Sequence, residues 1–285
     1  MAYKEFSWIT KDQLKLFAQA WTPEGEVKAV LALVHGIGEH SGRYQEVASV
    51  LNREGYALIG FDLRGHGRSE GPRGHFSYSE ALDDMDRLIN EAQKLFPGKP
   101  VYLYGHSMGG NLVLYYALKR LPTYLRGIIS TSPALGTARP VAGWKIALAR
   151  VMKGISPTMA MNNSLDLAGL SRNPDIIAAY KSDPLVHPLI STRLGWDLLQ
   201  SGPWLIEHAA EFPPIPLLIM QGSADQIVDP SATERFVKNA KGDITFRIWA
   251  GDYHELHNEP NRDEVFKVLL HWLEKYSFLE TKPSA

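Results

Sequence analysis

The chain has 285 residues, no cysteine and a formal net charge of −1, with 45% hydrophobic and 21% charged residues. This composition is typical of a globular protein with a large core, and it excludes disulfides, thiolate metal sites and a thiol nucleophile. The near-zero charge gives no electrostatic support for nucleic-acid binding, and no apolar run is long enough to span a membrane. Because Met1 is not followed by an apolar leader, we expect a soluble protein of the cytoplasmic type.

The first half of the chain is predicted to alternate strands and helices after an N-terminal hairpin. Alternating apolar residues over 6–9 and 14–20, around a polar turn, indicate this antiparallel hairpin. The continuous apolar run Ala29–Val34 indicates a strand buried on both faces, as in a parallel sheet. The patterns that follow predict helices over 44–54, 79–96 and 107–121 and strands over 57–61, 101–104 and Gly127–Thr131.

The second half of the chain adds strands over 215–220 and Ile244–Trp249 and helices near 231–240 and 260–276. Such alternation predicts an α/β fold with a doubly wound, mostly parallel sheet. A long interval with helical patches and several prolines, but no good strand, separates the sixth predicted strand from the seventh. We therefore expect a helical cap at 134–212, inserted after the sixth strand into a core made of residues 1–133 and 213–285.

The residues around Ser107 form the most informative local motif. Gly105-His106-Ser107-Met108-Gly109 is a G-x-S-x-G sequence between a predicted strand and a predicted helix, which is the arrangement of the nucleophile elbow in α/β-hydrolases. Glycines two residues before and after the serine remove Cβ atoms that would collide with the strand and the helix. Ser107 is therefore the candidate nucleophile, and the predicted reaction is acyl transfer to water.

A serine nucleophile needs a base and an acid, which follow it in the order Asp, His on this fold. The strand over 215–220 leads into Asp225, which we prefer over Asp229 because it lies nearer the end of that strand. The last strand leads into a loop with two histidines. We prefer His254 over His257 as the base, because His257 lies closer to the start of the next helix. The spacing of these histidines matches no zinc motif, so neither a metal nor another cofactor is predicted.

The oxyanion of the reaction needs two N–H donors. One is the Met108 amide, at the start of the helix after Ser107, and we assign the other to Ile37 in the loop after strand Ala29–Val34. The loop over 62–69 also contains aspartate, arginine and histidine. Its two glycines and its serine favour a tight scaffolding loop, whose polar side chains satisfy buried backbone groups, over a catalytic role.

Five blocks together resemble the monoacylglycerol lipases and the related lysophospholipase-like serine hydrolases. They are residues 34–44, which contain H-G-x-G-E-H-x-x-R-Y, and residues 62–71, 105–110, 221–225 and 253–257. The resemblance covers nearly all of the chain outside the predicted cap. It implies an α/β-hydrolase that cleaves monoacylglycerols to glycerol and a fatty acid without a cofactor. It also implies the triad Ser107, Asp225 and His254, with the amides of Ile37 and Met108 as the oxyanion hole.

The same resemblance implies that Glu39, Arg43 and His257 bind the hydroxyls of the glycerol. A salt bridge between Glu39 and Arg43 that only shapes their loop is the alternative. Two other activities stay open: a broader carboxylesterase or lysophospholipase with the same triad, and a silent receptor for small molecules. The presence of serine, aspartate and histidine at the three positions argues against the receptor.

The predicted cap contains an apolar segment, 141–153, with a tryptophan and a strip of basic residues, Lys145, Arg150 and Lys153. Such a segment suits a helix that makes peripheral membrane contact to collect a lipid substrate. It equally suits a cap helix packed over an apolar tunnel for the acyl chain. The sequence indicates neither the oligomeric state nor the preferred acyl chain.

Overall fold

The computed structural model describes residues 1–277, apart from the side chain of Lys145. Eight strands form one sheet in the order β1-β2-β4-β3-β5-β6-β9-β10, and only the β1–β2 and β2–β4 pairs among them are antiparallel. The strands are β1 (Ala2–Ile9), β2 (Lys15–Thr22), β3 (Ala29–Val34), β4 (Tyr56–Phe61), β5 (Val101–His106), β6 (Gly127–Thr131), β9 (Leu217–Gly222) and β10 (Ile244–Trp249). This confirms the predicted mostly parallel α/β sheet.

Two separate hydrophobic cores lie on the two faces of the sheet, because successive side chains of a strand point to opposite faces. In β3, Val30, Ala32 and Val34 belong to one core, while alternate residues of the same strand belong to the other. The first core also contains side chains of α2 (Tyr78–Leu95), α3 (Met108–Arg120) and α7 (Pro230–Asn239). The second contains side chains of α1 (Gln45–Arg53) and α8 (Arg262–Ser277). Burial on both faces explains why the central strands read as continuous apolar runs.

Some predicted boundaries moved for local reasons. The helix predicted over 44–54 begins as a 3-10 turn, Ser41–Tyr44, before α1. Helix α2 begins at Tyr78, one residue before the predicted start, because Ser77 caps it and forms a capping box with Glu80. Strand β9 begins at Leu217 rather than at 215. Pro216 precedes it and has no N–H to donate to a neighbouring strand.

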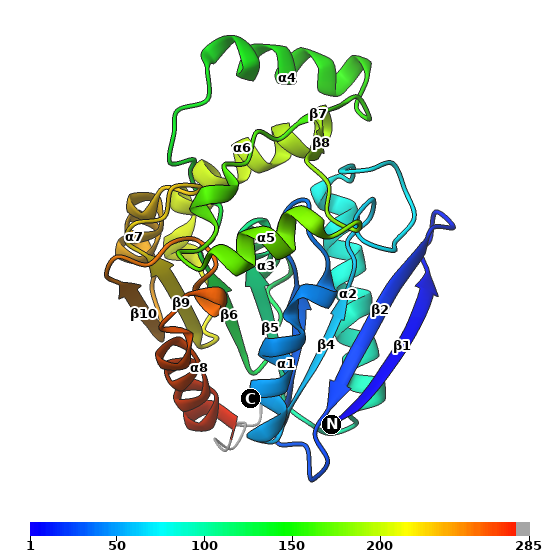
Figure 1. Ribbon diagram of the computed structural model, residues 1–285, viewed down its shortest axis with the longest axis vertical. Coiled ribbons are helices and arrows are strands. Elements are labelled where there is room, and N and C mark those ends of the chain that lie inside the picture. Colours follow the sequence, from blue (N-terminus) through cyan, green and yellow to red (C-terminus); the bar gives the residue numbers. More distant parts are fainter. Residues whose placement is uncertain (278–285) are drawn as a thin grey trace.

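The segment between β6 and β9 contains α4 (Gly143–Ile155), β7 (Ala160–Asn162), α5 (Pro174–Ser182), β8 (Leu189–Ser191) and α6 (Thr192–Glu207). We call this segment the insertion. The expectation that it holds no strand was wrong, because β7 and β8 pair as a small antiparallel sheet. Strands of three residues are too short to show an alternating pattern in the sequence. Figure 1 shows α4, α6 and the β7–β8 pair above the main sheet, with α4 farthest from it.

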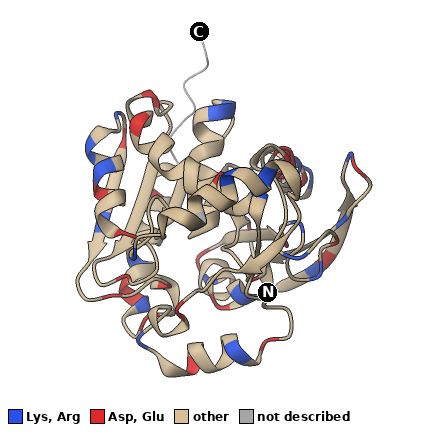
Figure 2. Cartoon of the chain, turned by 90° about the horizontal axis from the view of Figure 1, so that it is seen from above, with Lys and Arg blue, Asp and Glu red and all other residues tan. Residues whose placement is uncertain are grey.

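Basic and acidic residues are interspersed over the chain in the view of Figure 2. Within residues 1–277, none of the helices is both long enough and apolar enough to cross a bilayer. Helix α4 nevertheless presents large apolar side chains to the solvent. Trp144, Leu148, Val151 and Ile155 are between 40% and 72% exposed. At 100° per residue these four lie within about 60° of one another on the helix.

Candidate active site

Ser107 lies in the sharp turn between β5 and α3, with φ 55° and ψ −117°. These angles are in a sparsely populated region for a residue with a side chain, as expected for a strained elbow. The two flanking glycines are required by close packing. A Cβ on Gly105 would lie 2.2 Å from the Gly109 carbonyl oxygen, and a Cβ on Gly109 would lie 2.0 Å from the carbonyl oxygen of Val34. The turn thus holds the serine at the end of β5, ahead of the first residue of α3.

Asp225 and His254 lie on the loops that follow β9 and β10, and their side chains meet. The Nδ1 atom of His254 is 2.7 Å from Oδ2 of Asp225, and both side chains are buried. The other carboxylate oxygen of Asp225 accepts hydrogen bonds from the amides of Ile227 and Val228, at 2.8 and 3.0 Å. Because the carboxylate can only accept, Nδ1 of His254 carries the proton, which leaves Nε2 as the basic nitrogen.

The charge of Asp225 also shifts the basicity of His254. Burial disfavours the imidazolium form, but the negative charge and hydrogen bond of Asp225, helped by Glu255 and Glu39, outweigh it and raise the pKa of His254. The pKa of Asp225 is lowered despite its burial, because the His254 ring and two backbone amides favour the carboxylate. The pair therefore consists of an ionised acid and a base that readily accepts a proton.

Ser107 and His254 line the same pocket, a narrow space of about 10 Å³. Main-sheet loops contribute Ile37, Glu39 and Arg43, and the insertion contributes Leu165, Leu170 and Tyr180. Asp225 lies behind His254, as its contact through Nδ1 requires. The site is therefore formed by the C-terminal ends of parallel strands on one side and by the insertion on the other.

Asp229 and His257, the alternatives weighed for the acid and the base, make other contacts in the structure. Asp229 is the N-cap of α7, where its side chain accepts a hydrogen bond from the Ser231 amide. The ring of His257 stacks on Tyr44 with 5.0 Å between ring centroids and meets His106 edge-on at 5.1 Å. Both ring nitrogens of His257 are buried without a hydrogen-bond partner, and burial lowers the pKa of this histidine. His257 is not among the residues that line the pocket.

The loop after β3 passes close to Ser107. A Cβ on Gly36 would lie 3.2 Å from the Ser107 Cβ, so this loop contacts the elbow directly. The Gly36 amide donates to Oε1 of Glu39 at 2.6 Å. Ile37, the next residue, lines the pocket, and Met108 is the first residue of α3. The two amides predicted for the oxyanion hole thus belong to the two segments that flank the serine.

Glu39 and Arg43 form the ion pair that the sequence left as an alternative, and a third residue joins them. Arg43 Nη1 lies 2.5 Å from Glu39, and the guanidinium forms a two-pronged contact with Glu255 at 2.8 and 2.9 Å. All three side chains are at least 90% buried. Burial alone would raise the pKa of Glu39, but Arg43 and two nearby histidines hold it well below its usual range.

Glu255 and Tyr180 are among the pocket residues that the sequence did not single out. Glu255 is 212 residues from its partner Arg43, and its only signal was its position next to His254. Tyr180 is on α5, with its ring 4.7 Å from the guanidinium carbon of Arg43. The only pattern noted in the predicted cap was the apolar segment 141–153, so nothing in the sequence indicated that Tyr180 would reach the site.

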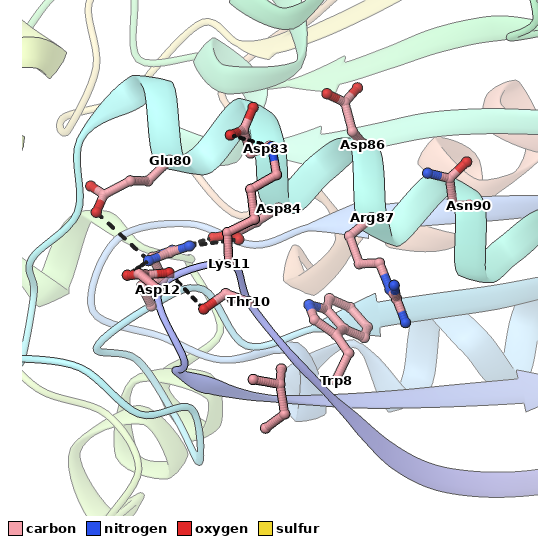
Figure 3. Close-up of a pocket in the computed structure, with 12 residues that line it drawn as sticks. Trp8, Thr10, Lys11, Asp12, Glu80, Asp83, Asp84, Asp86, Arg87 and Asn90 are labelled. Atoms are coloured by element: carbon pink, nitrogen blue, oxygen red, sulfur yellow. Dashed lines mark hydrogen bonds and ion pairs between the residues drawn. The ribbon is translucent and has the colours of Figure 1, made fainter.

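The loop over 62–69 acts as scaffold, and it borders a second, larger hollow. Arg64 is buried and forms ion pairs with Asp84 at 2.6 Å and Asp12 at 2.5 Å. Figure 3 shows Asp12 at the tip of the β1–β2 hairpin and Asp84 on α2, and both line, together with Arg64, a hollow of about 460 Å³. Trp8 lines the same hollow. Neither Ser107 nor His254 is among its lining residues, so the larger hollow is separate from the candidate active site.

Comparison with known proteins shows the family to which the chain belongs. Residues 25–261 match the family Hydrolase_4, described as serine aminopeptidase, S33. A monoacylglycerol lipase from Mycolicibacterium smegmatis is 32% identical over 94% of this chain and 96% of its own length. An uncharacterized abhydrolase domain-containing protein from Dictyostelium discoideum is 35% identical, but this chain spans only 28% of its length.

The crystal structure of the Paleococcus ferrophilus monoacylglycerol lipase is similar to the whole fold. It has a TM-score of 0.82 and 35% identity, and the match covers 97% of this chain and 100% of that one. The family match, the mycobacterial relative and this structure all cover most of the chain. The chain therefore belongs to the Hydrolase_4 family of α/β-hydrolases, together with the monoacylglycerol lipases it matches.

Proposed function

We propose that the protein hydrolyses the ester bond of monoacylglycerols to glycerol and a free fatty acid, through a triad of Ser107, His254 and Asp225. The observation that carries the proposal is the 2.7 Å contact of His254 with Asp225, behind a pocket that His254 shares with Ser107. Its relatives in Mycolicibacterium smegmatis and Paleococcus ferrophilus are named as monoacylglycerol lipases, which supports the substrate class.

In the proposed mechanism the Ser107 hydroxyl oxygen attacks the ester carbonyl carbon while Nε2 of His254 takes the hydroxyl proton. The amides of Ile37 and Met108 donate to the oxyanion of the tetrahedral intermediate, and Asp225 stabilises the imidazolium. His254 then gives the proton to the glycerol oxygen as the ester bond breaks, which leaves an acyl group on Ser107. A water molecule, deprotonated by His254, releases the fatty acid and restores the serine.

We further propose that Glu39 and Arg43 bind the glycerol side of the substrate. Both line the pocket next to Ser107, and a polyol requires several converging donors and acceptors. Their mutual ion pair keeps them in place without a substrate, so the salt bridge and the binding role are compatible. The resemblance placed His257 in the same role. We expect this residue to act indirectly, by packing its ring against Tyr44 and His106 behind the pocket.

We propose that the insertion moves when a substrate binds. Pockets for drug-sized ligands enclose about 300–1,000 Å³, far more than the space of about 10 Å³ beside Ser107. Leu165, Leu170 and Tyr180 of the insertion line the pocket on one side. We therefore propose that residues 134–212 act as a cap over a core of residues 1–133 and 213–285.

The proposal is tested by comparing substrates. Monoacylglycerol, diacylglycerol, triacylglycerol, a lysophospholipid and a short aryl ester are each hydrolysed under the same conditions, and the released acid is measured. A strong preference for monoacylglycerol is expected, because Glu39 and Arg43 favour a free glycerol headgroup. Equal rates on all esters would indicate a general carboxylesterase, and preference for the lysophospholipid would indicate a lysophospholipase. No activity on any of these esters would favour the alternative of a catalytically silent receptor for small molecules.

We also propose that α4 contacts lipid surfaces. Trp144, Val151 and Ile155 form part of its exposed apolar stripe, while Ala149, on another side, is buried where α4 packs on α6. An amphipathic helix of this kind inserts its apolar face at the boundary of headgroups and acyl chains. Of the predicted basic strip, Lys153 lies over the ring of Trp196 in α6, and the side chain of Lys145 lies outside the described part of the chain.

The substitution Trp144→Ser is expected to weaken binding to phospholipid vesicles more than it slows hydrolysis of a soluble short-chain ester. Removing the indole takes apolar area out of the membrane contact but leaves the catalytic groups in place. Vesicle sedimentation and the soluble-ester rate are measured in parallel. Ile248→Ser, an exposed apolar residue on β10, serves as the control. Unchanged vesicle affinity in Trp144→Ser would contradict the lipid contact.

A further inference from the structure

The loop that carries His254 is held along one side by residues 169–172 of the insertion. The His254 amide donates to the Gly169 carbonyl at 3.4 Å, and the Glu255 amide donates to the Leu170 carbonyl at 2.7 Å. The backbone of this loop, including that of His254 itself, therefore forms hydrogen bonds with a segment about eighty residues earlier in the chain. We call residues 169–172 the strap.

Arg172, the last residue of the strap, binds both ends of the same loop. Its amide donates to Oε1 of Glu259 at 2.8 Å, and its guanidinium also contacts the other carboxylate oxygen of Glu259. Nη2 reaches Oδ1 of Asp252 at 2.5 Å and the side chain of Asn261 at 3.0 Å. Asp252 and Glu259 lie on either side of His254 in the sequence. One guanidinium thus closes the loop around the histidine.

The two carboxylates depend on Arg172 because both are withdrawn from water. The side chains of Asp252 and Glu259 are 1% and 0% exposed, whereas that of Arg172 is 38% exposed. Removing one partner of such a pair leaves a buried charge without compensation, which favours movement of the loop toward the solvent. Burial already raises the pKa of Asp252, although Arg172 opposes the shift. Loss of the guanidinium would therefore loosen the loop at both ends.

We propose that Arg172 is a positioning residue for the general base: it fixes the loop over 252–259 so that His254 stays aligned between Asp225 and Ser107. The inference rests on the proposed function, in which His254 is the base. Arg172 does not line the pocket, so it acts only through the loop. Displacement of a catalytic group by about 1 Å can cost on the order of 100-fold in rate, so small movements of this loop matter.

The test compares Arg172→Gln with Arg172→Lys and with a matched control, Arg193→Gln. Arg193 is also on the insertion, is 42% exposed and forms an ion pair with Asp197 at 2.8 Å, but that pair is on α6. For each variant, kcat, KM and the pH profile of kcat/KM are measured on a soluble short-chain ester. The downfield proton NMR signal of His254 Nδ1, assigned by its loss in His254→Asn, is recorded as well.

In Arg172→Gln we expect kcat to fall about 10- to 100-fold while KM changes little. The acid limb of kcat/KM should move to lower pH, because a displaced His254 receives less support from Asp225, and the His254 signal should shift or broaden. The groups around His254, which none of the variants changes, are Asp225, Glu255, Glu39, His106 and His257. Arg172→Lys should recover part of the loss, and Arg193→Gln should match the wild type.

A lower unfolding temperature in Arg172→Gln with unchanged kcat, pH profile and His254 signal would overturn the proposal, since it shows a packing role alone. Equal losses in Arg193→Gln would also overturn it, because any damage to the insertion would then suffice. If Arg172→Gln does not fold, Arg172→Lys is judged by the same readouts. If the wild type hydrolyses no ester, the proposed function fails, and the His254 signal still decides whether Arg172 positions the histidine.

Discussion

Replacing Ser107 with alanine is expected to lower kcat for ester hydrolysis by about 10⁶-fold, the scale seen when a serine nucleophile is removed from a triad. Alanine has no hydroxyl to form the acyl-enzyme, so only the oxyanion hole and substrate binding remain. The backbone should tolerate the change, because alanine has the same Cβ as serine at φ 55°. Steady-state rates on monoacylglycerol and on a short aryl ester measure the effect, and circular dichroism measures the folded state.

Ser201→Ala is the matched control. Ser201 is another buried serine, but its hydroxyl donates to the Tyr78 hydroxyl and not to a proposed catalytic residue. It should keep the activity of the wild type. Labelling with an organophosphorus ester adds an independent readout, since the reagent bonds to an activated serine. The wild type and Ser201→Ala should be labelled, and Ser107→Ala should not. Hydrolysis retained by purified, folded Ser107→Ala would exclude Ser107 as the nucleophile.

The second large effect is expected for Asp225→Asn, which should lower kcat by about 10⁴-fold with little change in structure. The amide of asparagine can turn its NH₂ toward Nδ1 of His254. The ring would then carry its proton on Nε2, where a lone pair is needed to accept the proton of Ser107. Asp229→Asn, at the N-cap of α7, is the control and should cost a little stability rather than activity. A large loss of kcat in Asp229→Asn alone would show that the wrong aspartate was chosen.

The pH profile gives a separate check on the same pair. The rate requires neutral His254, so kcat/KM should fall as the pH drops through the pKa of this residue. In the wild type Asp225 raises that pKa above the ordinary histidine value of about 6.5, so the loss begins at a correspondingly higher pH. In Asp225→Asn, burial acts without the carboxylate, and the acid limb should move to lower pH. An acid limb at the same pH in both proteins would contradict the assignment.

Features that depend on neighbouring residues in the chain could be predicted from the sequence. The continuous apolar strands follow from burial on both faces, and the elbow follows from two glycines that no other residue could replace. The order of Ser107, Asp225 and His254 could be predicted because each lies directly after a strand or within a few residues of its end, and the ends of parallel strands meet at one edge of a sheet. In the structure His254, and not His257, contacts Asp225, and the choice of His254 as the base stays a prediction for the mutants to test.

Contacts between distant segments were decided by the tertiary structure alone. Arg43 meets Glu255 across 212 residues, and Arg172 meets Asp252 across 80. Neither pair leaves a pattern in the sequence, because a charged side chain looks the same whether it faces water or a buried partner. The β7–β8 pair and the position of Leu165, Leu170 and Tyr180 at the pocket likewise depend on how the insertion folds and packs. The sequence alone thus determined the sheet and the order of the loops that carry Ser107, Asp225 and His254, since these follow from local periodicity and glycine sterics. Only the packed fold determined which side chains surround them, because burial and charge pairing exist only after distant segments meet.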